Sequence, residues 1–123
     1  MLACEQILEF LGLENSMFKV ASTLGLVDRK RLEVARALAT KPKLLLLDEM
    51  MSGLTPAEIE DGVHLIRSIA DSGVGLIVVE HVMKAIMEVS LRLVVLNYGE
   101  KIAEGEPREV VRMPQVIEAY LGE

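Results

Sequence analysis

The chain has 123 residues, of which 51% are hydrophobic, and 13 Lys and Arg against 19 Asp and Glu give it a formal net charge of −6. This composition is typical of one globular domain, while the acidic balance and 3% aromatic content exclude nucleic-acid binding as a predicted function. No apolar run approaches the roughly 20 residues that cross a bilayer. Cys4 has no cysteine partner in the chain, which favours a reducing compartment. Together these features predict a cytoplasmic domain without membrane insertion.

The first 23 residues predict a helix that runs through Ile7 and Leu11 and ends at Gly12, followed by an irregular stretch. A second helix is expected over 28–40, where apolar residues recur on one face. Lys41-Pro42 ends that pattern. We expect the N-terminal segment to pack beside a sheet without joining it.

Three short apolar runs predict strands at 44–47, 74–79 and 91–96. Each run is nearly continuous rather than alternating, which is typical of strands that are covered on both faces in a parallel sheet. Helical patterns at 55–71 and 82–89 separate the three runs. The order strand, helix, strand, helix, strand predicts an α/β fold with a parallel sheet core flanked by helices.

The helix after the first strand has a clear predicted start. Thr55 stands at the N-cap, Pro56 at the first helical position and Glu58 at the third, which is a capping box. At the other end of the chain, a turn at 97–100 precedes a short antiparallel strand at 101–104. Two terminal helices are expected to begin at prolines, and the second is expected to bury an apolar set: Val116, Ile117, Tyr120 and Leu121.

Chemically active side chains follow the first two predicted strands. Asp48 and Glu49 end the first, and His81 comes just after the second. Because parallel strands end at one edge of a sheet, we expect all three side chains at the edge where ligand crevices lie. There Asp48 could hold a hydrated Mg²⁺ that bridges phosphate oxygens, Glu49 could position or deprotonate a water, and His81 could donate to a phosphate oxygen.

Two other interpretations of these residues stay open. Strands commonly end in a solvated acid that has no catalytic role. The three side chains could also form a carboxylate–imidazole metal site in a small metal-dependent hydrolase, although a zinc site would usually have a further His or Cys nearby. We assign no role to His64, and Met50-Met51 and Cys4 are predicted to pack in the structure.

Three segments and one histidine resemble ABC-type ATPases. Residues 44–49 resemble the Walker B strand, 31–38 the helix after the signature loop, 52–55 the D-loop, and His81 the switch histidine. Further segments resemble the ATPases of branched-chain amino-acid transporters: 53–58, 94–99, 101–105 and 116–123.

This resemblance implies a partial P-loop NTPase fold, with ATP and Mg²⁺ as cofactors. It implies that Asp48 assists Mg²⁺ coordination, that Glu49 is the general base and that His81 senses the γ-phosphate. Gly25 of the signature loop, and the D-loop residues Ser52, Gly53 and Thr55, would lie near nucleotide across a dimer. The implied partners are a second ATPase subunit, as in a homodimer, and a membrane permease, with the protein peripheral at the inner face of the membrane.

The sequence also departs from the family. No G-x-x-x-x-G-K-[ST] loop occurs in it, so the cradle for the β- and γ-phosphates is missing. The resemblance therefore implies the C-terminal half of such an ATPase, with 1–27 as a remnant of the helical subdomain and 28–123 as core within a single domain. In the signature loop, Gly25 replaces a serine and Asp28 adds repulsive charge. We expect no ATP binding or meaningful hydrolysis by this chain alone.

A second hypothesis is a non-catalytic interaction module. A half cassette would leave sheet edge and helix-packing surface uncovered, and such surface seldom stays bare. Self-association would cover it, and a homodimer with exchanged N-terminal segments is one form that it could take.

Overall fold

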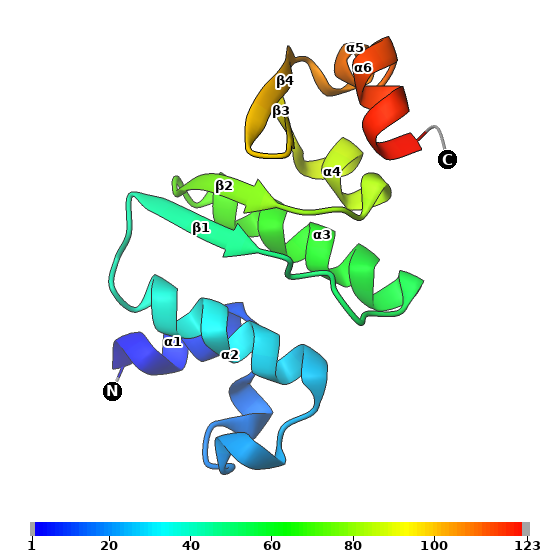
Figure 1. Ribbon diagram of the computed structural model, residues 1–123. Coiled ribbons are helices and arrows are strands. Elements are labelled where there is room, and N and C mark those ends of the chain that lie inside the picture. Colours follow the sequence, from blue (N-terminus) through cyan, green and yellow to red (C-terminus); the bar gives the residue numbers. More distant parts are fainter. Residues whose placement is uncertain (1, 122–123) are drawn as a thin grey trace. The chain divides into compact units, whose positions relative to one another are not determined.

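The computed structural model describes residues 2–121, and it describes side chains for residues 3–120. Leu121 as a core residue, and Gly122 and Glu123 of the last matching segment, lie outside the described side chains. The chain forms two compact units, residues 1–80 and residues 81–123 (Figure 1). The predicted division into 1–27 and 28–123 stays a prediction.

The first unit pairs two parallel strands with three α-helices. Its elements are α1 (Leu2–Phe10), α2 (Leu26–Leu38), β1 (Leu44–Asp48), α3 (Pro56–Asp71) and β2 (Gly75–Val79), with short 3-10 turns at Glu14–Ser16 and Ala21–Thr23. Figure 1 shows β1 and β2 side by side, with α3 running along them and α2 next to β1. This arrangement confirms the α/β class with parallel strands flanked by helices. Cys4 of α1, expected to pack, is instead exposed.

One face of the β1–β2 pair is covered and the other is not. The strands are in register from Leu44 opposite Gly75 to Asp48 opposite Val79. Leu45 and Leu47 are buried, as are Val63, Ile66 and Ile69 of α3. The other face exposes four apolar side chains: Leu44, Leu46, Ile77 and Val79. The prediction of strands covered on both faces is therefore wrong within the first unit, because the continuous apolar runs supply two apolar faces and the helices of this unit cover one.

The second unit is a hairpin with short helices. It comprises α4 (Met83–Val89), β3 (Leu93–Asn97), β4 (Glu100–Gly105), α5 (Pro107–Val110), α6 (Pro114–Val116) and a π-helical turn (Ile117–Leu121). Tyr98 and Gly99 both have positive φ, as the type I′ two-residue hairpin turn requires. The small core consists of Val95, Ala103, Val110 and Val116.

The hairpin corrects one expectation and confirms another. The run at 91–96 was expected to join the parallel sheet, but β3 pairs with β4 in an antiparallel ladder, because the turn at 98–99 reverses the chain. The antiparallel strand expected at 101–104 is confirmed. On β4, a hydrogen bond from Lys101, together with the charges of Lys101 and Arg92, lowers the pKa of Glu104 below its ordinary value of 4.5.

The terminal helix differs from its predicted pattern. Val116 is buried as expected, but Ile117 and Tyr120 are exposed. The Tyr120 hydroxyl donates a hydrogen bond to the carbonyl of Leu96, so this aromatic ring is held by its polar end rather than by burial. Among the helices of residues 2–121, none is long and apolar enough to cross a membrane.

Candidate functional site

The two carboxylates predicted to be functional lie at the end of β1. Asp48 is the last residue of the strand and Glu49 the first of the following loop, and both side chains are exposed. Because Asp48 lies opposite Val79 in a parallel register, β1 and β2 end together at one edge. The edge predicted from the sequence is therefore present in the backbone of the first unit.

The backbone of Glu49 is held in an unusual conformation. Its φ is +51°, in the left-handed region that non-glycine residues seldom adopt. Its N–H donates to the carbonyl of Val79 at 2.8 Å, and its own carbonyl accepts from the N–H of Ser52 at 3.3 Å and from Nζ of Lys30 at 3.4 Å. If the strand continued through Glu49, its side chain would point to the other face of the sheet from that of Asp48. That alternation ends at Asp48, since the left-handed residue turns the chain.

A carboxylate without a role predicted from the sequence completes this turn. Oε1 of Glu80 accepts a hydrogen bond from the N–H of Met51 at 2.8 Å, and Glu80 is half-buried. Its position in the sequence is a signal that could have identified it. Glu80 directly follows β2, as Glu49 directly follows β1, and adjacent parallel strands bring such residues together.

The loop that carries Ser52 and Gly53 packs against the start of α2. Gly53 has φ +77°, and a Cβ there would lie 3.2 Å from Cδ2 of Leu26. Gly25 is the N-cap of α2, directly before Leu26. The D-loop and signature-loop candidates therefore meet in the first unit.

Thr55 already has a structural function. Its hydroxyl oxygen accepts from the N–H of Glu58 at 3.2 Å, and its own N–H donates to Oε1 of Glu58 at 3.0 Å. The predicted capping box at the start of α3 is thus confirmed.

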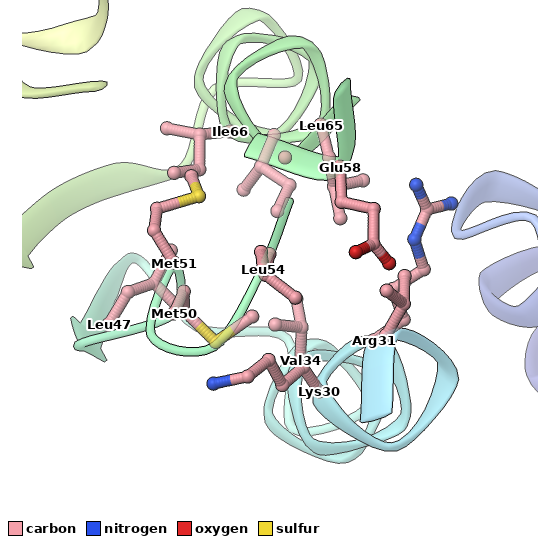
Figure 2. A pocket seen from close by; sticks show the side chains of 13 residues that line it. Lys30, Arg31, Val34, Leu47, Met50, Met51, Leu54, Glu58, Leu65 and Ile66 are labelled. Carbon is pink, nitrogen blue, oxygen red and sulfur yellow. The ribbon is translucent and has the colours of Figure 1, made fainter. Parts of the chain in front are cut away.

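An apolar pocket lies between α2, the loop after β1 and α3 (Figure 2). Figure 2 shows Leu54 reaching between the two helices, with Met51 beside Ile66. Lys30, Arg31 and Glu58 also line it. Its volume is about 30 Å³, close to that of one water molecule and far below the several hundred Å³ of a small-molecule site. It is a small gap in the packing of the loop against the two helices, not a nucleotide site.

His81 is the first residue of the second unit, and its side chain is exposed. It follows β2 by two residues, as the sequence predicted. Its approach to Asp48 and Glu49 stays a prediction.

The described part of the chain contains no group of three or more His, Cys, Asp and Glu side chains that could hold a metal ion. This donor set does not suit a metal enclosed by protein ligands. It does suit Mg²⁺, which commonly takes one or two carboxylates and fills its other positions with water and substrate phosphates. Asp48, exposed at the strand end, is the residue that would hold it.

Comparison with known proteins shows what the chain is similar to. The model of the family described as branched-chain amino acid ATP-binding cassette transporter matches residues 100–123. Over 117 residues, the chain is 39% identical to the high-affinity branched-chain amino acid transport ATP-binding protein BraF of Pseudomonas aeruginosa, and 40% to LivG of Salmonella typhimurium. The chain matches the C-terminal part of a branched-chain ATP-binding cassette subunit.

Solved structures show the same similarity. The cassette MJ1267 in its ADP conformation superposes with a TM-score of 0.89 at 31% identity, over 98% of this chain and 49% of that one. BraF and LivG are each matched over 94% of this chain and 46% of their own length. The chain thus spans about half the length of the relatives it matches, and its fold is that of a partial P-loop NTPase.

Proposed function

We propose that these 123 residues carry the hydrolytic half of the ATP site of a branched-chain amino-acid transporter's ATPase subunit. In this proposal Asp48 holds Mg²⁺ through its carboxylate, Glu49 takes a proton from the attacking water, and His81 donates a hydrogen bond to the γ-phosphate. The observation that carries it is the placement of Asp48 and Glu49 at the end of β1, beside the parallel end of β2, in a cassette fold.

The same proposal holds that this chain alone does not hydrolyse ATP. Its sequence has no phosphate-binding loop, so it lacks the backbone N–H groups and the lysine that hold the β- and γ-phosphates. The β- and γ-phosphates of ATP would therefore have to be bound by residues that this sequence does not contain. The subunit would work in the cytoplasm with a second ATPase subunit and a membrane permease. The assembled transporter would carry a branched-chain amino acid.

A chimera tests the assignment. The N-terminal part of the BraF relative would be joined to this chain, and ATP hydrolysis measured. Glu49→Gln should lower kcat at least a hundredfold, since a general base typically contributes a factor of 10² to 10⁴. Glu60→Gln, which neutralises an exposed acid on α3, is the matched control and should leave the rate within twofold.

The altered signature loop belongs in the same experiment. Gly25 lacks the hydroxyl that the family's serine supplies, so Gly25→Ser should raise the rate of the chimera severalfold. A chimera that binds ATP but hydrolyses none, with or without this serine, would contradict the proposal. So would hydrolysis that does not respond to Glu49→Gln.

One observation favours a second candidate, the self-associating module. The uncovered face of the β1–β2 pair presents Leu44, Leu46, Ile77 and Val79. Beside it runs an open groove of about 250 Å³ between α2 and β1. Apolar surface of this kind favours association with another polypeptide.

A further inference from the structure

The loop after β1 is tied to the end of β2 at two points. The first is the hydrogen bond from the N–H of Glu49 to the carbonyl of Val79, which extends the ladder one residue beyond the strand. The second is the hydrogen bond from the N–H of Met51 to Oε1 of Glu80. The first uses backbone atoms alone and is available to any sequence, whereas the second depends on the side chain at position 80.

The residue between these two ties has little freedom. Met51 is 2% exposed, and its side chain packs so closely on α3 that a Cβ on Gly62 would lie 2.9 Å from its sulfur. The loop is therefore held by two contacts of Met51. Its side chain packs on α3, and its N–H donates to the carboxylate of Glu80. Glu49, two residues earlier and in the left-handed region, is held between the β2 ladder and this anchor.

We propose that Glu80 is a positioning residue for Glu49. Its carboxylate holds the Met51 amide, and this contact fixes the turn at 49–52 that presents the Glu49 side chain at the end of β1. A charged acceptor makes a shorter and stronger hydrogen bond than a neutral one, and a half-buried place shields it from water. The functional part of this inference depends on the proposed role of Glu49 as general base.

The first test measures the contact in this chain itself. Hydrogen exchange of the Met51 amide would be followed by NMR in the wild type, Glu80→Gln, Glu80→Met and Glu80→Ala. Gln keeps an acceptor oxygen at the same reach, and Met keeps the length without an acceptor. We expect Met51 exchange to quicken at least tenfold in Glu80→Met and Glu80→Ala and less than threefold in Glu80→Gln, with the Ile69 amide of α3 as the reference for global opening.

The second test measures the consequence in the chimera. Glu80→Met should lower kcat about tenfold with KM for ATP within twofold, since the loop positions the base rather than the substrate. Glu80→Gln should restore most of the rate. If Glu80→Met fails to fold, Glu80→Ala and Glu80→Gln make the same comparison.

The outcomes separate the two proposals. Equal Met51 exchange in Gln, Met and Ala variants, or equal kcat in all of them, overturns the inference about Glu80. Loss of rate in Glu49→Gln without loss in Glu80→Met overturns it too, and leaves the proposed function standing. A rate insensitive to Glu49→Gln contradicts the proposed function, while the exchange measurement still decides whether Glu80 holds the loop.

Discussion

At the scale of single residues, glycine is required at one position of the site and dispensable at another. Gly53 has φ +77°, and a Cβ added to it would lie only 3.2 Å from the side chain of Leu26. Gly25 has φ −71° and open space around it. The two glycines stand in adjoining segments, so they make a matched pair.

Gly53→Ala should lower the free energy of unfolding by about 1–2 kcal/mol, because a Cβ is disfavoured in the left-handed region and would press on Leu26. Gly25→Ala should change it by less than about 0.5 kcal/mol. Urea unfolding followed by circular dichroism measures both. Equal effects from the two substitutions would show that backbone conformation does not decide the need for glycine here.

At the scale of elements, α3 is the helix whose start the sequence specifies most fully. Thr55, Pro56 and Glu58 supply the N-cap, the first-position proline and the reciprocal hydrogen bond. These are local interactions between neighbours in the chain, so the sequence alone is enough to predict them.

Thr55→Ala should lower the free energy of unfolding by about 1 kcal/mol, since the N–H of Glu58 loses its acceptor. Thr55→Ser keeps a hydroxyl and should cost only a few tenths of a kcal/mol by the same reasoning. Urea unfolding again gives the values. An alanine variant as stable as the serine variant would contradict the importance of the cap.

The elements also differ in how fully the sequence predicts them. Strand positions and the edge at Asp48 follow from apolar runs and parallel order. The pairing of β3 with β4 does not, because a continuous run such as 91–96 does not specify its neighbour, and the deciding feature is the turn at Tyr98 and Gly99. The role of Glu80 does not follow from the sequence for a related reason. Its partner is a backbone N–H 29 residues away, and nearly every residue has such a group, so no residue type marks the contact.

At the scale of the whole molecule, the uncovered sheet face predicts self-association. Leu46 is 67% exposed on that face and Leu91 is 96% exposed elsewhere. We expect concentration-dependent dimerisation at micromolar concentrations in analytical ultracentrifugation. Leu46→Glu should weaken it at least tenfold, because a charge would replace an apolar contact, and Leu91→Glu is the matched control. A chain that stays monomeric at these concentrations would rule the prediction out.

The most direct test of the account is a calorimetric titration of this 123-residue chain with ATP and Mg²⁺. The chain keeps the acids that would act on a nucleotide and contains no loop to hold one. We therefore predict no saturable binding up to millimolar ATP, with the BraF chimera as the positive control. Micromolar affinity of the chain by itself would contradict the account.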